Sequence, residues 1–189
     1  MLDVFCGMGG ASSGFALEGF DVTGIDIEDA PNKLGYKHRF IQADITQLDG
    51  KDFLGFDVIW GSPPCRNFTI LNDATWKEKK DPAKGLITVN AFLQFVEDAQ
   101  PKFWIMENVF GLKRYLAGAK ISMAKIGGKR HVFYGNFPAF LLPESNKFKV
   151  RESCGWDKLQ HWKRSKIPLT CSQAFAKACK EALINSDSS

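Results

Sequence analysis

The chain has 189 residues, of which 44% are hydrophobic and 13% aromatic, so we expect one compact domain and exclude extensive disorder. No apolar run reaches the roughly 18 residues of a membrane-spanning helix, and Met1 leads directly into an apolar run without a secretory leader, which favours a cytoplasmic protein without membrane contact. The five cysteines are scattered and form no CxxC pair, so we expect neither a disulfide framework nor a metal site.

Charge is divided unevenly along the chain. Residues 1–100 hold 9 Lys and Arg against 15 Asp and Glu, whereas residues 101–189 hold 16 against 6. Because clustered cations attract phosphates over long distances, the basic half indicates a polyanionic partner. An ordinary solvated basic surface is the alternative interpretation.

Strand-like and helix-like segments alternate along the sequence. Apolar or alternating runs predict strands at Leu2–Phe5, Asp21–Ile27, Arg39–Ala43, Phe56–Trp60, Phe103–Met106 and His131–Tyr134. Helical spacing predicts helices at Ala11–Leu17, Leu86–Ala99 and Gln173–Ile184, with a polar loop at 72–84 and a basic helix after residue 108. This order is typical of a doubly wound, Rossmann-like α/β sheet with right-handed crossovers.

Residues that suit a nucleoside follow the first three predicted strands, where ligands bind in open α/β sheets. The first strand runs into Cys6–Gly10, a turn whose glycines let the backbone approach a ligand closely. Asp26 is placed to accept both hydroxyls of a ribose, and Asp44 to accept from an adenine amino group. Each acid by itself is more readily explained as a helix cap or a turn residue, but the three features together indicate a nucleoside cofactor.

Two reactive side chains follow later strands. Cys65 stands after the stiff pair Pro63 and Pro64, and a cysteine displayed in this way is a candidate nucleophile if a cation such as Arg66 lowers its pKa. A small buried hydrophobic residue is the alternative. Glu107 ends an apolar strand, where it could donate a proton or anchor a hydrogen bond.

These clusters resemble the motifs of the DNA cytosine-5 methyltransferase family. The matching segments stand in the order of the family at Asp3–Gly10 for the cofactor motif, Asp26 and Asp44–Thr46 for the second and third motifs, Ser62–Thr69 for the nucleophile loop and Met106–Val109 for the acidic motif. The resemblance covers residues 2–112, and the pairing of Pro-Pro-Cys with Glu-Asn-Val is specific.

The resemblance implies transfer of a methyl group from S-adenosyl-L-methionine to C5 of cytosine in DNA, with S-adenosyl-L-homocysteine as product and a restriction–modification setting. Cys65 would add to C6 of a cytosine flipped out of the stack, while Glu107 holds N3 and shares its proton. The residues implied in cofactor binding are Phe5, Gly7, Met8, Gly9, Gly10, Asp26, Ile27, Asp44, Ile45, Pro64 and Thr170. The oligomeric state is not predicted.

The later motifs match less closely. The family places paired basic residues on a strand after the acidic motif, one of them holding the cytosine O2. Here His131 aligns with that arginine and Arg130 lies one place earlier, so both are candidate catalytic residues. Only 24 residues separate Glu107 from His131, which favours a sheet with one strand fewer than in the family. Arg164–Thr170 resembles the last motif, which packs beside the cofactor.

The expected division is a cofactor-binding and catalytic domain at 1–134, a short basic and aromatic recognition region at 135–163, and a C-terminal extension at 164–189 whose helix packs back on the catalytic domain. Interleaved aromatic residues and cations suit nucleic acid, although a small lobe with its own core is the alternative. The residues expected to bind nucleic acid are Arg66, Asn67, Lys113, Arg114, Lys129, Lys163 and Arg164.

Two other functions fit the same residues. One branch of the family modifies tRNA, so methylation of cytosine C5 in RNA is the nearest alternative. The second is a non-catalytic, regulatory protein that binds S-adenosylmethionine, which the short recognition region and the shifted Arg130 favour.

Overall fold

The structure is a computed structural model that describes residues 1–69, 79–116, 121–126, 129–142 and 166–187. Within these ranges seven strands form one sheet in the order β3-β2-β1-β4-β5-β7-β6. The parallel strands are β1 (Leu2–Val4), β2 (Thr23–Asp26), β3 (Arg39–Gln42), β4 (Val58–Gly61) and β5 (Phe103–Asn108). β7 (Lys129–Asn136) runs antiparallel between β5 and β6 (Ile121–Ile126). The predicted doubly wound α/β fold is confirmed.

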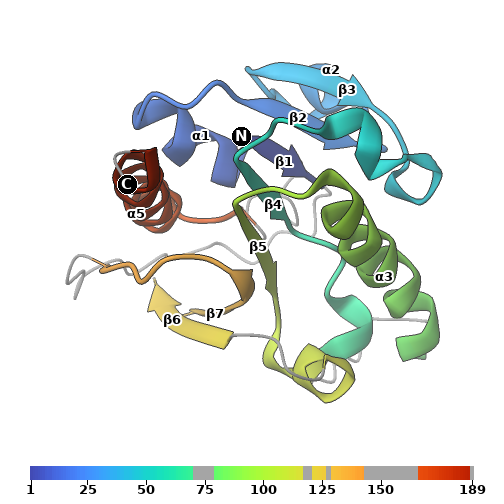
Figure 1. The fold of residues 1–189 in the computed structure, drawn as a ribbon. Coiled ribbons are helices and arrows are strands. Elements are labelled where there is room, and N and C mark those ends of the chain that lie inside the picture. The colour runs from blue at the N-terminus through green and yellow to red at the C-terminus, as the bar shows by residue number, and fades with distance from the viewer. Residues whose placement is uncertain (70–78, 117–120, 127–128, 143–165, 188–189) are drawn as a thin grey trace.

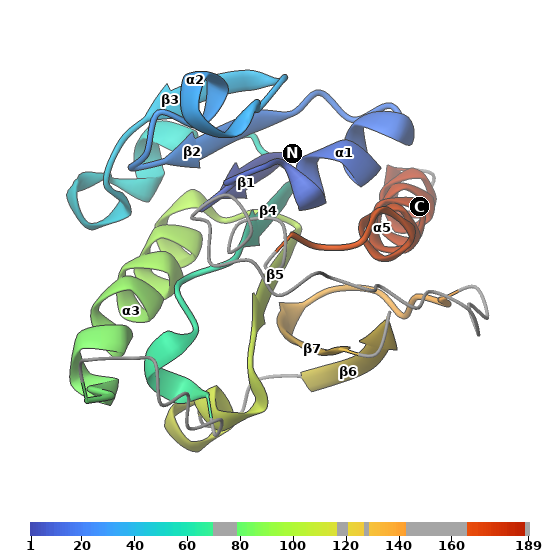
Figure 2. The ribbon, with the colours of Figure 1, turned by 180° about the vertical axis from the view of Figure 1, so that it is seen from behind.

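Helices cover both faces of the sheet, as Figures 1 and 2 show. The α-helices are α1 (Gly10–Leu17), α2 (Ala30–Leu34), α3 (Pro82–Ala99) and α5 (Leu169–Asp187). Short 3-10 helices are η1 (Ile45–Gln47), η2 (Gly50–Phe53), η3 (Arg66–Phe68) and η4 (Phe110–Tyr115). α1 and α5 lie side by side on one face and α3 on the other (Figure 1), so each face encloses a separate apolar core.

Alternation along β4 divides its side chains between the two cores. Trp60 packs with α1 and α5, whereas Ile59 packs with α3, because successive side chains of a strand point to opposite faces. The Trp60 ring lies 6.2 Å from Phe15, 5.8 Å from Phe133 and 5.2 Å from Phe175 between centroids. Phe175 therefore joins the C-terminal helix to the centre of the sheet.

The chain after β5 differs from the prediction. η4 stands where a basic α-helix was expected, and β6 follows as a strand, so the expectation of a sheet with a missing strand is wrong. The reason is that an antiparallel hairpin needs only a short connection, whereas a parallel crossover needs a dozen or more residues. Two strands therefore fit between Glu107 and Asn136.

α3 begins at Pro82, earlier than the predicted start at Leu86, because Asp81 caps it. The Asp81 carboxylate accepts from the backbone amides of Ala83 and Lys84, and proline at the first helical position is preorganised for the helix. Residues 79–84 of the predicted loop are described and residues 72–78 lie outside the described ranges.

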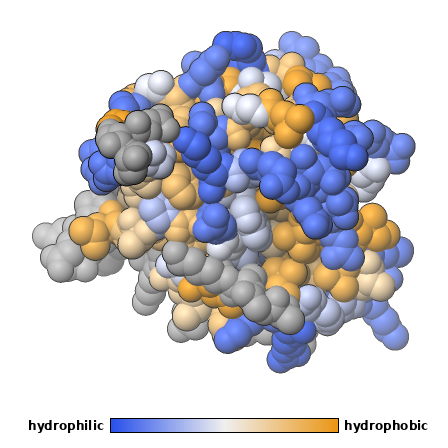
Figure 3. All heavy atoms as spheres, viewed as in Figure 1, coloured by the Kyte–Doolittle hydropathy of each residue, from blue (hydrophilic) through white to orange (hydrophobic). Residues whose placement is uncertain are grey.

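Part of the predicted recognition region is described. Phe137 is buried and packs with Phe140 and with Phe175 of α5, so these two rings belong to the core. Residues 143–163 of that region lie outside the described ranges. On the face shown in Figure 3, hydrophilic residues gather over α2 and β3. Of the described helices, none has both the length and the apolar character to cross a bilayer.

Candidate active site

The predicted motifs meet at one edge of the sheet. Val4 is paired with Ile25 and with Gly61, and Gly61 with Met106, so these four residues stand at one level near the carboxyl ends of β1, β2, β4 and β5. The residues that come next along the chain are Phe5, Asp26, Ser62 and Glu107, of which Asp26 is the last residue of β2 and Glu107 the last but one of β5. This is the edge at which open α/β sheets bind their ligands.

The turn after β1 has a backbone conformation that suits close contact with a ligand. Gly7 and Gly9 have φ of 49° and 70°, a conformation that favours glycine, and the Gly9 amide donates to the carbonyl of Cys6 at 2.8 Å. Phe5 shares the positive φ, at 62°, while its ring packs 6.5 Å from that of Phe92. Met8 is half-buried on the same turn. The turn therefore presents backbone atoms, rather than bulky side chains, to the sheet edge.

Gly10 has a packing role. A Cβ at this position would lie 2.6 Å from the backbone nitrogen of Ile167, so the segment before α5 rests directly on the start of α1. This contact brings the predicted last motif beside the glycine turn, with Thr170 exposed in the first turn of α5.

Two acids occupy the predicted nucleoside positions. Asp26 is buried, and its carboxylate accepts from the amides of Gly7 at 2.9 Å and Glu28 at 3.0 Å, while burial raises the pKa of this carboxyl. Ile27 follows with 63% of its surface exposed, which offers an apolar face beside the acid. Asp44 caps η1 by accepting from the Thr46 amide at 3.0 Å. Both acids thus also stabilise the local backbone.

A buried network beneath the turn was not predicted. Asp3 accepts from the hydroxyl of Ser12 at 2.5 Å, and that hydroxyl lies 2.9 Å from the hydroxyl of Tyr36. Burial raises the pKa of Asp3 to about 7, against the opposing hydrogen bonds from Ser12. The only sequence signal was an acid inside an otherwise apolar strand. The network links β1 to α1 and thereby stabilises the glycine turn between them.

The loop after β4 displays the thiol of Cys65. Asn108 donates from Nδ2 to the carbonyl of Pro63 at 3.0 Å, which ties the loop to β5. Pro63 is buried, whereas Pro64 and Cys65 are exposed. Asn67, expected to bind nucleic acid, accepts from the backbone amide of Asp81 at 3.1 Å and so links the loop to α3.

The electrostatic surroundings of Cys65 differ from those expected. Although the residue has exposed surface, neighbouring atoms desolvate its thiolate, and this burial together with the charge of Glu107 raises the pKa of Cys65 to about 11. The expected lowering by Arg66 is therefore wrong, because desolvation and the nearby carboxylate oppose the thiolate. Gly61 of β4 is paired with Met106 of β5, which places the loop that carries Cys65 beside the strand that carries Glu107.

His131 lies in the same site as Glu107. Its Nδ1 lies 3.1 Å from Oε1 of Glu107, and its ring stacks on Phe133 at an interplanar angle of 15°. The His131 side chain is 9% exposed and that of Glu107 is 19% exposed. Arg130 occupies the preceding position of β7, with its backbone paired to Lys125, and the side chains of Arg130 and Lys129 lie outside the described part of the structure.

Comparison with known proteins agrees with this arrangement. The family model described as C-5 cytosine-specific DNA methylase matches residues 1–125. This chain belongs to the C-5 cytosine-specific DNA methylase family.

Several relatives are similar to this chain over the same part. Type II methyltransferase M.DdeI of Desulfomicrobium norvegicum is 33% identical over 121 residues, which are 59% of this chain and 28% of the relative. Type II methyltransferase M1.HphI of Haemophilus parahaemolyticus is 32% identical over 128 residues, 62% of this chain and 34% of the relative. The chain thus spans about a third of the length of these relatives.

A solved structure shares the fold. The protein is described as a DNA modification methyltransferase encoded within a prophage of E. coli, with 25% identity and a TM-score of 0.53. The match covers 71% of this chain and 45% of the other.

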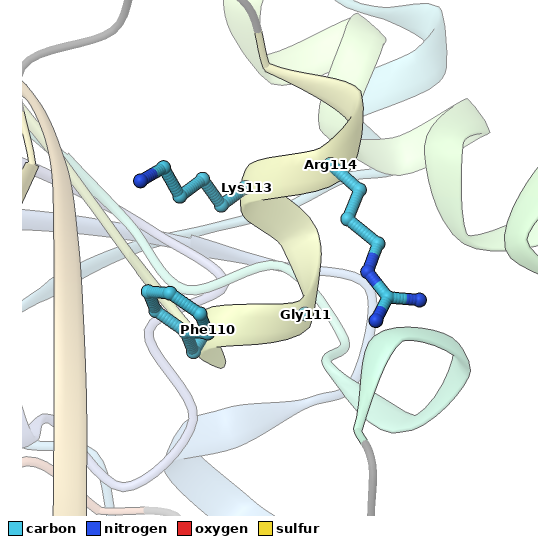
Figure 4. Close-up of a pocket in the computed structure, with 4 residues that line it drawn as sticks. All are labelled: Phe110, Gly111, Lys113 and Arg114. Carbon is cyan, nitrogen blue, oxygen red and sulfur yellow. The ribbon is translucent and has the colours of Figure 1, made fainter.

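Cations of this chain gather on η4, beside the loop that carries Cys65. Lys113 and Arg114 are exposed and, with Phe110 and Gly111, line a shallow pocket (Figure 4) of about 260 Å³. The Lys113 Nζ lies 5.7 Å from the centre of the Phe110 ring. η4 packs directly on η3, because a Cβ at Gly111 would overlap the carbonyl oxygen of Phe68. Lys163 and Arg164 lie outside the described residues.

The raised pKa of Cys65 predicts its reactivity in the protein without bound ligands. Because the thiolate is the reacting form, alkylation of Cys65 by iodoacetamide should accelerate about tenfold per pH unit between pH 7 and 10 and level off only near pH 11. Peptide mass spectrometry would measure this rate. A plateau already at pH 8 would contradict the raised pKa. Cys171, fully buried, is the internal control and should remain unmodified in the folded protein.

Proposed function

We propose that this chain transfers the methyl group of S-adenosylmethionine to C5 of cytosine in DNA through a covalent adduct with Cys65. The observation that carries the proposal is the pairing of β4 with β5, which places the loop of Cys65 beside the strand that carries Glu107, with Asn108 of that strand donating to the carbonyl of Pro63 in the loop. The family supports the reaction class, and relatives carry the name Type II methyltransferase.

The edge of the sheet fits S-adenosylmethionine, which supplies an electrophilic methyl group when bound. Gly7 and Gly9 have positive φ and no Cβ, so their backbone can approach a ligand closely, Asp26 offers carboxylate oxygens for ribose hydroxyls, and exposed Ile27 offers an apolar face for adenine. Asp44 stands after the next strand of the sheet, where it can accept from the adenine amino group. We therefore assign these residues to cofactor binding.

The chemistry needs a nucleophile because C5 of cytosine is too weak to take a methyl group directly. Attack of the Cys65 sulfur on C6 pushes the C5–C6 π electrons toward N3, which takes a proton from Glu107. C5 is then enamine-like and takes the methyl group, while the electrons of the broken sulfonium C–S bond stay on S-adenosylhomocysteine. The C5 proton is lost to a base, the Cys65 sulfur leaves C6, and N3 returns its proton to Glu107, which restores the ring. The target base must leave the duplex stack to reach Cys65.

A direct assay tests the proposal. The purified chain is incubated with tritiated S-adenosylmethionine and, in parallel, with duplex DNA or tRNA, and a duplex containing 5-fluorocytosine is used to trap the adduct. We expect label in duplex DNA and a Cys65–DNA adduct by mass spectrometry. Label in tRNA alone would show that the substrate is RNA rather than DNA. Calorimetric binding of S-adenosylmethionine without any adduct would instead support a non-catalytic regulatory protein.

Contacts between η4 and the DNA backbone give a second prediction. Lys113→Glu and Arg114→Glu should each weaken duplex binding and reduce the slope of log affinity against log salt by about one, because each lost phosphate contact releases fewer counterions. Fluorescence anisotropy at several salt concentrations measures both effects. Lys177→Glu, on the exposed side of α5, is the matched control and should change neither affinity nor slope beyond the effect of net charge. Equal losses in all three variants would exclude a specific contact at η4.

A further inference from the structure

We propose that Phe110 contacts the DNA bases directly, with its ring stacked against a nucleobase of the target strand beside the flipped cytosine. This inference rests on the proposed function and deepens it, since it names the part of the DNA that the surface of η4 contacts. Cations such as Lys113 and Arg114 bind phosphates, which every nucleotide carries, whereas an aromatic ring binds the face of a base.

The ring of Phe110 lies at the surface of a well-packed segment. Of the phenylalanines in the described ranges it is the one that is exposed, at 53%. The backbone of η4 is fixed on the opposite side, because Leu112 is fully buried and the Tyr134 hydroxyl donates to the carbonyl of Val109 at 3.0 Å. Binding of a base therefore orders only one side chain with two rotatable bonds, which keeps the entropy cost low.

The helix type places a cation next to this ring. Residues three apart in a 3-10 helix lie above one another, so Phe110 and Lys113 share one side of η4, while Arg114 extends on the other (Figure 4). Among the described residues neither cation is in an ion pair, so both charges are available to phosphates. An aromatic ring beside free cations, at the edge of a shallow pocket, is the combination with which proteins hold unstacked nucleic acid.

The backbone joins Phe110 to both reactive side chains of the site. η4 begins directly after the strand that carries Glu107. Gly111 packs on the carbonyl of Phe68, and the Phe68 amide donates to the carbonyl of Cys65 at 3.0 Å. A cytosine that leaves the duplex for this site deprives its neighbouring bases of a stacking partner. A ring beside the site can cover the open face of such a neighbour and so offset part of the cost of flipping.

Binding to two single strands separates contact with bases from contact with phosphates. Fluorescence anisotropy compares an oligodeoxynucleotide of mixed sequence with an abasic strand that carries the same number of phosphates. Phe110→Ala should bind the first strand about fivefold to a hundredfold more weakly and the abasic strand with unchanged affinity, because only the first offers bases for stacking. Its slope of log affinity against log salt should remain that of the wild type, because no phosphate contact is lost.

Three further variants identify the property of the side chain that matters. Phe110→Tyr keeps the aromatic ring and should bind both strands as the wild type does. Phe110→Leu keeps an apolar side chain without a π face and should lose affinity for the base-bearing strand as Phe110→Ala does. Leu54→Ala, at another exposed apolar position, before the start of β4, is the matched control and should leave both affinities unchanged.

Equal losses on both strands, or wild-type binding by Phe110→Leu, would overturn the inference, because a merely structural or apolar role would produce these results. If Phe110→Ala does not fold, irradiation of the wild-type protein with a single strand containing 5-iodouracil decides, since this base cross-links to aromatic rings on which it stacks. Mass spectrometry should locate the cross-link at Phe110, and cross-links confined to other residues would refute the contact. Base-dependent binding without any methyl transfer would instead refute the proposed function and leave the stacking contact intact.

Discussion

Replacement of Cys65 by alanine should abolish methyl transfer, with a loss of at least about a thousandfold that leaves only background. The reason is that removal of the sulfur removes the adduct that makes C5 nucleophilic, and no other described thiol reaches the site edge, since Cys6, Cys171 and Cys179 are buried. Incorporation of tritium into duplex DNA measures the loss. Because Cys65 lies on an exposed loop, the free energy of unfolding should change little.

Binding of S-adenosylmethionine to Cys65→Ala provides the control for this variant. The thiol follows β4, whereas the proposed cofactor cradle follows β1, so calorimetry should give an unchanged affinity. Methyl transfer at the wild-type rate by Cys65→Ala would remove the thiol from the mechanism.

Glu107→Gln should reduce methyl transfer by about a hundredfold to ten-thousandfold, the usual range for loss of a general acid. Glutamine keeps the shape of the side chain and an oxygen that can accept from His131, so the hydrogen bond of 3.1 Å can persist while the transferable proton is lost. Single-turnover transfer to duplex DNA measures the effect. A loss below tenfold would show that N3 is protonated by another group.

Glu107→Gln should increase the reactivity of the Cys65 thiol, although it slows methyl transfer. Because the charge of Glu107 contributes to the raised pKa of Cys65, its removal lowers that pKa and should accelerate alkylation of Cys65 at pH 8. Glu97→Gln, on the exposed face of α3, is the matched control and should alter neither reaction. Slower alkylation together with slower transfer would indicate local unfolding rather than loss of an acid.

Much of the parallel sheet could be predicted from the sequence. β4 and β5 are short apolar runs that end at Gly-Ser-Pro-Pro and at Glu-Asn, which are signals readable from local residue types. The hairpin of β6 and β7 was not predicted, although Gly127 and Gly128 separate two alternating runs in the sequence. The basic residues around this pair suggested a helix, and the pairing with β5 decided the structure.

The site was predictable where its motifs follow strand ends. Cys65 and Glu107 are brought together by the parallel register of β4 and β5, which the order of elements implies. The pKa of Cys65 was not predictable, because it depends on how closely other segments surround the thiol. The network of Asp3, Ser12 and Tyr36 was missed for the same reason, since its members come from three separate segments.

The contact of Ile167 with Gly10 has a consequence for synthesis on the ribosome. Phe175 of α5 covers Trp60 and Phe133, so a nascent chain that has released only its first 140 residues carries an open apolar face on its sheet. Closure requires α5, which is synthesised long after β1 and β4, and such distant pairings form slowly. The glycine turn after β1 is therefore completed only once the segment around Ile167 has been synthesised, and chaperones can bind the open apolar face during that interval.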